Sequence, residues 1–331
     1  LASPSNPTGT SIARAELERI ARFVREKGGV TLIDEIYLGL SYDEAYGHSA
    51  LGLPDGLGDE VISVNSFSKY FNMTGWRLGW LVLPPALVPV VERLAQNLFI
   101  CASTIAQHAA LACFEPESLA EFERRRAEFK ARRDYFIPEL NRLGLTVPVM
   151  PDGAFYAWAD VSGLCERWGI PPQGARADEG GSWALAFELM KRCQLATTPG
   201  RDFGNADPGR YLRFSTANSM AQLREAVARL EADKRADTAQ RQAIATRALA
   251  GLKLVRHPNS YFIWLPLGDD QRADRIAATL AERGVSVSTA EGFATTTHVP
   301  HALRIALGSV ALEDLARALA VVKDVVVQDC S

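Results

Sequence analysis

The sequence lacks three features that would each assign it to a class of protein. No apolar run approaches the roughly 18 residues that a membrane-spanning helix needs. None of the five cysteines belongs to a CxxC pair, so we expect no metal site, and free or buried thiols in a reducing compartment, the cytoplasm. The formal net charge is only −3 and no basic patch is present, so nucleic acid and anionic membrane surfaces are not expected partners.

The composition is that of an ordinary globular protein. The chain has 331 residues, of which 47% are hydrophobic and 23% charged, enough for two or three domains. Apolar periodicity predicts a helix over 12–27, and an apolar run predicts a short buried strand over 30–33. Similar patterns predict strands at 61–64 and 78–83, and helices at 86–99, 103–114 and 117–142. Residues 1–115 are therefore predicted to form an α/β domain with a mostly parallel sheet.

From Gly144 onward the pattern changes to short strands with fewer helices. The predicted strands and helices of this part are strands at 145–149, 154–159, 195–198 and 210–214, and helices at 182–192 and 219–233, with a loop at 171–182. These elements predict a compact α/β small domain over residues 116–235.

The remainder of the chain repeats this small domain. Residues 234–247 are polar and predict a linker helix. Pro151–Trp158 is then echoed by Pro258–Trp264, and Tyr211–Ser215 is echoed by Ala302–Ala306. A last helix is predicted over 311–325. We therefore expect a second small-domain-like unit, a duplication, over residues 236–331.

The most informative stretch is Ser66-Phe67-Ser68-Lys69, followed by Arg77. A lysine amine can form a Schiff base with an aldehyde cofactor, and hydroxyls with an arginine can hold that cofactor's phosphate. Taken alone, Lys69 would be read as a solvated surface lysine. Asp34 directly follows the first predicted strand, where open α/β sheets bind ligands, although it could equally cap the next turn.

Five pieces of sequence together resemble one enzyme family. In order they are Ser5–Gly9, Asp34–Tyr37, Ser66–Lys69, Arg77 and Tyr211–Phe214, and they resemble the fold-type I, pyridoxal-phosphate-dependent aminotransferases of class I/II over residues 1–233. The resemblance implies an α/β PLP-transferase fold and a homodimer. It also implies an enzyme that transfers an amino group between an α-amino acid and a 2-oxo acid, with pyridoxal 5'-phosphate as cofactor.

The resemblance also implies a role for each matching residue on the ring side of the cofactor. Lys69 would hold the cofactor covalently and then move the proton during catalysis, for which its amine must be neutral. Asp34 would pair with the protonated pyridine nitrogen. Tyr37 and Asn6 would donate hydrogen bonds to the phenolate oxygen.

Further roles follow for the cofactor's phosphate and for the substrate. Ser66 and Arg77 would hold the phosphate, with Ser68 a weaker candidate. Arg213 would bind the substrate's α-carboxylate through a bidentate pair, with Asn6 beside it. Each residue also has a plainer structural interpretation, such as a surface ion pair for Arg213.

The C-terminal part carries a second resemblance. Residues 240–328 resemble the terminal small domain of the aminotransferase-like half of MocR-type transcriptional regulators, on His257–Leu265, Val285–Phe293 and Pro300–Arg304. In that setting Arg304 would bind a carboxylate, but no second lysine motif precedes it, so we expect a structural role. A non-catalytic, PLP-binding sensory module is therefore an alternative function. A PLP-dependent lyase of the same fold is another, because cofactor-binding residues do not fix the reaction.

The family has a large-domain segment ahead of the Asn6 turn that has no counterpart in this sequence. That segment supplies strands of the sheet, so we expect exposed sheet edges and an uncovered sheet face. We also expect a fragment or a fusion product.

Overall fold

In the computed structural model, the described residues are 1–172, 181–294 and 299–329. The predicted loop over 171–182 and Cys330 therefore lie partly or wholly outside the described residues. The chain divides into two compact units. The first unit comprises Leu1–Asn141, Thr146–Ala159 and Arg213–Arg224, and the second comprises Arg142–Leu145, Asp160–Leu212 and Glu225–Ser331.

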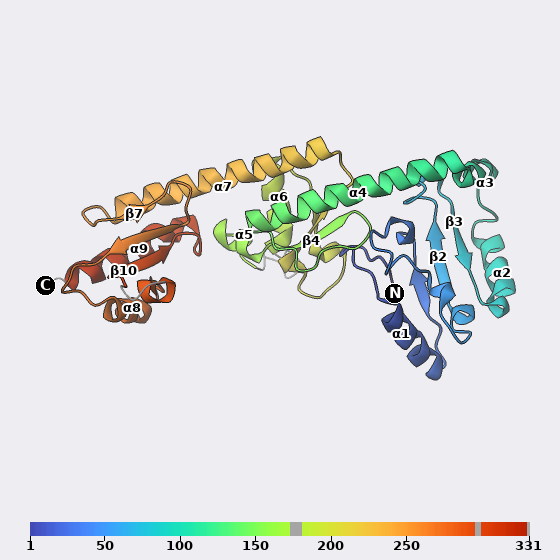
Figure 1. The fold of residues 1–331 in the computed structure, drawn as a ribbon, viewed down its shortest axis with the longest axis horizontal. Helices are drawn as coiled ribbons and strands as arrows, with labels where there is room; N and C mark the ends of the chain where they lie inside the picture. The colour runs from blue at the N-terminus through green and yellow to red at the C-terminus, as the bar shows by residue number, and fades with distance from the viewer. Residues whose placement is uncertain (173–180, 295–298, 330–331) are drawn as a thin grey trace. The chain divides into compact units, whose positions relative to one another are not determined.

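The first unit begins with a helix and a three-stranded sheet. Helix α1 (Arg14–Glu26) is followed by strands β1 (Leu32–Asp34), β2 (Ile62–Ser66) and β3 (Gly79–Val82). The strand order is β1-β2-β3, with β1 parallel and β3 antiparallel to β2, and β2 and β3 lie side by side (Figure 1). The expected α/β class is confirmed.

One face of this sheet carries a core and the other is more open. Leu17 and Ala21 of α1 pack in a cluster with Ile33, which is fully buried. Burying a leucine or isoleucine side chain contributes about 1.5–3 kcal/mol. Leu32, however, is 50% exposed, and Leu81, which the register places on the same face, is 48% exposed. The prediction that the first strand is buried throughout is therefore wrong, because only one side of it is packed among the described residues.

The next helices match the prediction closely. They are α2 (Val88–Leu98), α3 (Thr104–Leu111) and α4 (Pro116–Leu143). Phe67 packs in a cluster with Met73, Leu78 and alanines of α3. Since Phe67 lies between Ser66 and Lys69, this cluster fixes the turn that presents the lysine.

The α/β lobe after α4 contains β4 (Tyr156–Asp160), α5 (Ser162–Arg167), α6 (Gly181–Cys193), β5 (Thr198–Pro199) and β6 (Tyr211–Ser215). We call residues 156–215 the middle lobe. Its strand order is β4-β6-β5. The strand predicted over 145–149 does not form. Pro148 lies within that stretch, and proline has no backbone N–H to donate to a strand ladder.

Helix α7 (Met220–Ala248) is one continuous helix of 29 residues. The predicted change from a domain helix to a linker helix at residue 234 is wrong, because neither glycine nor proline interrupts this segment. Its polar part has one exposed face and one buried face. Arg241 is fully buried and donates to Asp237 and to the backbone oxygens of Arg167, Leu307 and Val310.

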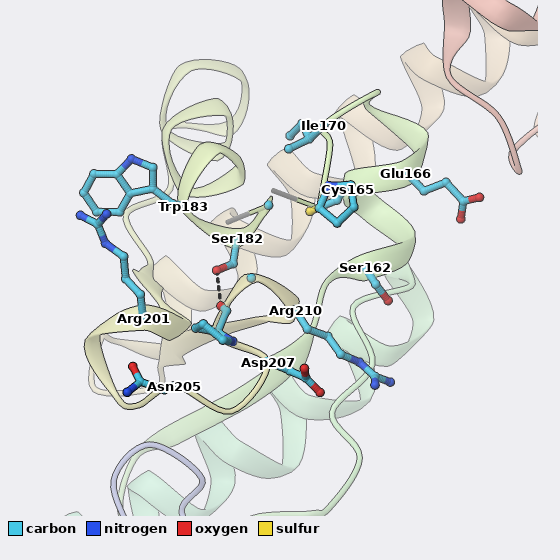
Figure 2. Close-up of a pocket in the computed structure, with 14 residues that line it drawn as sticks. Ser162, Cys165, Glu166, Ile170, Ser182, Trp183, Arg201, Asn205, Asp207 and Arg210 are labelled. Carbon is cyan, nitrogen blue, oxygen red and sulfur yellow. Dashed lines mark hydrogen bonds between the residues drawn. The ribbon is translucent and has the colours of Figure 1, made fainter. Parts of the chain in front are cut away.

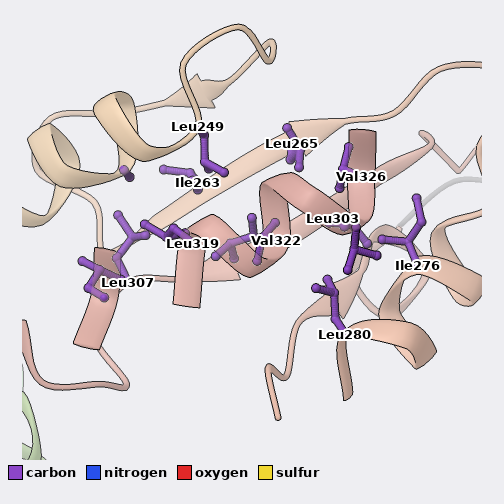
Figure 3. Close-up of a cluster of buried hydrophobic side chains, with 14 residues drawn as sticks. Leu249, Ile263, Leu265, Ile276, Leu280, Leu303, Leu307, Leu319, Val322 and Val326 are labelled. Carbon is purple, nitrogen blue, oxygen red and sulfur yellow. The ribbon is translucent and has the colours of Figure 1, made fainter. Parts of the chain in front are cut away.

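The C-terminal lobe, residues 249–329, has its α-helices and strands in the described stretches 249–294 and 299–329. They are β7 (Val255–Arg256), β8 (Phe262–Pro266), α8 (Ala273–Glu282), β9 (Ser288–Thr289), β10 (Ala302–Ala306) and α9 (Leu312–Gln328). The strand order is β7-β8-β10-β9, and each pair is antiparallel. Figure 3 shows Ile263 and Leu265 of β8 and Leu303 of β10 among side chains from α8 and α9.

The middle and C-terminal lobes share part of their arrangement. Strand β4 pairs with β6 as β8 pairs with β10, and the short strands β5 and β9 pair with the other edge of β6 and β10. Helix α6 or α8 precedes the short strand, and α7 or α9 follows the last strand. The C-terminal lobe has the further strand β7 beside β8, and the middle lobe has the further helix α5. The predicted duplication and the predicted domain boundaries at 115 and 235 stay predictions.

None of the helices in the described residues combines the length and the apolarity that crossing a bilayer requires.

Candidate active site

Three strand ends bring the predicted site residues to one edge of the first unit's sheet. Because β1 and β2 are parallel, Asp34 and Ser66, the last residues of the two strands, lie at the same edge. Strand β3 runs the other way and starts at that edge, where Gly79 pairs with Ser66. Arg77 precedes β3 by two residues and is therefore held at the same edge.

Lys69 is half-buried against aromatic rings. Its amine lies 5.5 Å from the centre of the Tyr37 ring and 5.9 Å from that of Phe155. Burial lowers the pKa of Lys69, and the positive charges of Arg213 and Arg77 lower it further, against a smaller opposing effect of Asp34. The neutral amine is therefore more accessible at ordinary pH than on an exposed lysine.

Tyr37 is buried, with 4% of its surface exposed, and its hydroxyl lies 2.7 Å from the hydroxyl of Tyr156. Burial raises the pKa of Tyr37. The phenol therefore keeps its proton throughout the ordinary pH range and can donate it in a hydrogen bond.

Arg213 of β6 is joined to the start of the chain. Its Nη1 donates to Oδ1 of Asn6 over 2.6 Å, and its guanidinium lies 4.3 Å from the centre of the Tyr156 ring. Asn6 belongs to a turn whose Gly9 carbonyl accepts hydrogen bonds from the backbone of Asp152 and Gly153.

Gly9 itself is required at this turn. It has a φ of +68°, and a Cβ there would come within 2.8 Å of Pro151 and 2.9 Å of the Gly153 oxygen. The Asn6 turn is thus fixed to the segment that leads into β4. This contact brings Asn6 and Arg213 together although they are 207 positions apart.

The two carboxylates that follow β1 have different surroundings. Asp34 accepts a hydrogen bond from the backbone N–H of Ile36 over 3.0 Å and is only partly buried. Glu35 is 3% exposed, and its carboxylate accepts from Ser49, Ser63 and the backbone of Ala50. Glu35 therefore stabilises the fold, and Asp34 is the carboxylate available to a ligand.

Arg77 and Ser66 also lie at this edge of the sheet. Arg77 has a φ of +53° and donates to the carbonyl of Thr74 over 2.9 Å. Within the described ranges no carboxylate lies within ion-pair distance of Arg77. The Ser66 hydroxyl accepts from the backbone N–H of Ser68 over 3.0 Å, so it is held inside its own turn.

The structure therefore brings together most of the predicted set. The residues whose charges, rings or hydrogen bonds meet around the lysine are Lys69, Asp34, Tyr37, Arg77, Arg213 and Asn6. Ser66 lies at the same edge without a hydrogen bond to any of them in the described part of the chain. Tyr156, which contacts both Tyr37 and Arg213, was missed by the sequence reasoning.

A cavity of about 1030 Å³ lies elsewhere, in the second unit. Figure 2 shows Trp183 beside Arg201 at one side of it and Glu166 with Ser162 at the other. It contains none of the predicted site residues. Burial raises the pKa of its cysteine, Cys165, to about 12, which makes that thiol unreactive.

No group of three or more residues suited to bind a metal occurs among the residues described.

Comparison with known proteins gives one consistent family. The family model described as "Aminotransferase class I and II" matches residues 1–230. The chain is 36% identical over 230 residues to a valine–pyruvate aminotransferase of Mycobacterium tuberculosis, covering 70% of this chain and 55% of that one. It is 37% identical over 229 residues to an aspartate aminotransferase of Streptomyces avermitilis, covering 69% of this chain and 54% of that one.

Solved structures give the same result. An aminotransferase from Mycobacterium tuberculosis superposes with a TM-score of 0.62 at 35% identity, over 70% of this chain and 56% of that one. An aromatic aminotransferase from Pyrococcus horikoshii gives a TM-score of 0.62 at 33% identity, over 71% of this chain and 59% of that one. The chain spans about half the length of the curated relatives it matches. The family model ends at residue 230, so the predicted resemblance of residues 240–328 to MocR-type regulators stays a prediction.

Proposed function

Because the chain belongs to the family of class I and II aminotransferases, we propose that it takes part in transferring an amino group between an α-amino acid and a 2-oxo acid. The observation that carries the proposal is the half-buried amine of Lys69, whose pKa is lowered beside Tyr37 and between the charges of Arg213 and Arg77. A lowered pKa increases the share of the neutral amine, which is the form that acts as a nucleophile and as a base.

The donor set fits pyridoxal 5'-phosphate, the cofactor used generally by this family. A carboxylate, a nucleophilic amine, a protonated phenol and an arginine without a carboxylate partner in the described residues meet at one sheet edge. When bound, the cofactor would supply an aldehyde that reacts with amines and a ring that withdraws electrons. The protein's own residues would bind it, orient it and move the proton.

Lys69 would bind the cofactor covalently through its Nζ and, once the substrate's amine has displaced it, the freed Nζ would act as the base. Its neutral Nζ would take the proton from the substrate's α-carbon and later deliver it to a carbon of the cofactor. The aromatic rings of Tyr37 and Phe155 limit the volume that the amine can occupy, which helps to keep it oriented.

Asp34 would hold the positive charge of the ring nitrogen, since its carboxylate has remaining acceptor capacity at the end of β1. The Tyr37 hydroxyl would donate a hydrogen bond to the phenolate oxygen of the cofactor's ring. Asn6 would donate to the same oxygen through its amide Nδ2, because its Oδ1 already accepts from Arg213.

Arg77 would hold the phosphate together with Ser66, and Arg213 would hold the substrate's α-carboxylate. A guanidinium presents its donors in a planar fork that matches a carboxylate or a phosphate. Arg213 is already oriented by Asn6 and by the ring of Tyr156, so little side-chain entropy remains to be lost when a carboxylate binds.

The test uses the full chain and visible absorbance. Pyridoxal phosphate is added, and then amino acids with a 2-oxo acid partner, with valine, aspartate and aromatic amino acids in the panel because relatives carry those names. We expect a visible band with the wild type, a change of that band with at least one amino acid, and formation of the new amino acid.

Lys69→Ala should lose the covalent band, whereas Lys191→Ala, at an exposed helical site, should keep it. An unchanged band in Lys69→Ala would show that the site is assigned wrongly. A band that responds to no amino acid would instead favour the sensory-module alternative, and ammonia as product would favour the lyase. No observation on the described residues favours either alternative.

We also propose, from the family alone, that the assembled protein is a homodimer. A cytoplasmic location is proposed from the sequence, whose five cysteines are scattered with none at CxxC spacing.

A further inference from the structure

We propose that Tyr156 is a positioning residue that transmits carboxylate binding at Arg213 to the hydroxyl of Tyr37. This inference rests on the proposed function, because it takes Arg213 as the carboxylate site and Tyr37 as a hydrogen-bond donor to the cofactor. Tyr156 itself lies between the two and needs no contact with either ligand.

Two contacts of Tyr156 carry the proposal. On one side its hydroxyl lies 2.7 Å from that of Tyr37, and the two rings meet edge to face with centres 5.6 Å apart. On the other side the guanidinium of Arg213 lies 4.3 Å from the centre of the same ring. Tyr156 is 6% exposed and Tyr37 is 4% exposed, so their hydroxyls meet away from water, where electrostatic effects are strong, while Arg213 is partly buried.

The charge of Arg213 favours one direction for the hydrogen bond between the two hydroxyls. Hydroxyl dipoles orient in the local field, and a nearby cation favours the arrangement with the hydrogen pointing away from it. Tyr156 then donates to Tyr37. Because a hydroxyl has a single hydrogen, this direction leaves the Tyr37 hydrogen free for an acceptor next to Lys69.

A bound carboxylate would neutralise much of the field of Arg213. The preference for Tyr156 as donor then weakens, and the hydrogen bond that Tyr37 can offer weakens with it. Substrate binding at the carboxylate end would in this way change the hydrogen bonding at the cofactor end, next to the lysine amine. The hydroxyl of Tyr156 is the group that the coupling needs, while its ring alone supports Arg213.

The experiment uses the full chain without cofactor and 3-phenylpropionate as probe, a carboxylate without amino or oxo groups. The ¹³Cζ signal of Tyr37, assigned with Tyr37→Phe, reports hydrogen bonding at its hydroxyl. We expect this signal to move saturably with the probe and not with the matched neutral amide. In Tyr156→Phe the movement should be lost, while affinity for the probe changes by less than about fivefold, because the ring and its cation–π contact remain.

Matched variants separate coupling from general damage. Tyr70→Phe also removes a hydroxyl, one that bonds Glu123 over 2.6 Å, and should keep the response. Arg213→Gln should abolish the response, whereas Arg304→Gln, its counterpart in the C-terminal lobe, should keep it. If the Tyr37 signal does not move in the wild type, or moves equally in Tyr156→Phe, the coupling does not exist. Because no cofactor is involved, a positive result would stand even if the amino-transfer test failed.

Discussion

The middle lobe and the C-terminal lobe share part of their arrangement but differ in what surrounds the same arginine. In the middle lobe Arg213 lies over Tyr156 at 4.3 Å and donates to Asn6. In the C-terminal lobe Arg304 lies over Phe262 at 3.5 Å and near Phe293 at 4.5 Å. Both arginines follow a buried leucine in the last strand of their sheet.

The difference lies in the polar groups next to each arginine. Tyr156 has a hydroxyl that reaches Tyr37, and Lys69 lies beyond it, whereas phenylalanine at 262 offers no hydroxyl. The described residues of the C-terminal lobe place no lysine beside Arg304. The shared arrangement therefore supplies the arginine and its aromatic support twice, but a reactive amine only once. The fold of such a lobe does not by itself create an active site.

The largest expected effect is on the free energy of unfolding, through the buried Arg241 that hydrogen-bonds to both lobes. Arg241→Ala removes a fully buried guanidinium, so three backbone oxygens lose its N–H donors and Asp237 loses its ion pair while keeping the hydrogen bond from Tyr261. Breaking a buried ion pair in this way costs about 3–5 kcal/mol. Urea unfolding followed by far-ultraviolet circular dichroism should show this loss in the transition of the second unit. Arg272→Ala, whose pair with Asp274 is exposed, should change stability by less than about 0.5 kcal/mol. Similar losses for both variants would contradict the assigned role of Arg241.

The next effect compares the two cores. Leu212 and Leu303 are both fully buried and each precedes its arginine. Leu212→Ala and Leu303→Ala should each lower the free energy of unfolding by about 2–5 kcal/mol, through lost burial and a residual cavity. Only Leu212→Ala should also weaken binding of a carboxylate probe, measured by isothermal titration. If Leu303→Ala weakened that binding as much, the two lobes would share a site and the comparison would fail.

A smaller effect separates the two arginines. Arg213→Gln should lower kcat/KM for the amino acid by about 10- to 100-fold, the range for loss of a hydrogen bond to a charged group. Arg304→Gln should leave kcat/KM unchanged, since no residue of the described site contacts it. Steady-state kinetics of both variants with one amino acid checks this. Equal losses would mean that Arg304 also serves the reaction.

The smallest effect is the pH dependence of stability due to Lys69. Its pKa in the folded chain is below the ordinary value of 10.5, so between these two values the unfolded chain binds more protons. The wild type should therefore gain stability as pH rises through that window, relative to Lys69→Met. The urea concentration at the midpoint of unfolding, measured for the wild type and Lys69→Met from neutral pH up to pH 10.5, gives this difference in stability. Lys191→Met, at an exposed lysine, is the control. A relative loss of stability with rising pH would refute the lowered pKa.

Local patterns predicted most of the elements, and the resemblance to the family supplied the candidate site residues. The helix ending before Gly28, the strands that end at Asp34 and Ser66, and the turn at Asn6 all follow from spacing and residue type. Predictions failed where neighbours decided the outcome. The stretch over 145–149 has strand-like residues but no partner ladder, and the polar half of α7 buries one face, on which Arg241 donates to the backbone oxygens of Arg167 and Leu307.

By itself, the sequence determined the type of fold, the lysine motif and the order of the family's residues, because these depend on local spacing along the chain. Tertiary structure alone decided which groups meet. Tyr156 carries no local signal that separates it from a core tyrosine, and it becomes a link only because folding places it between Tyr37 and Arg213. The lowered pKa of Lys69 also depends on folding, because burial and the charges of Arg213 and Arg77, which lie elsewhere in the sequence, produce it. Contacts between residues far apart in the chain depend on packing, and no local pattern encodes them.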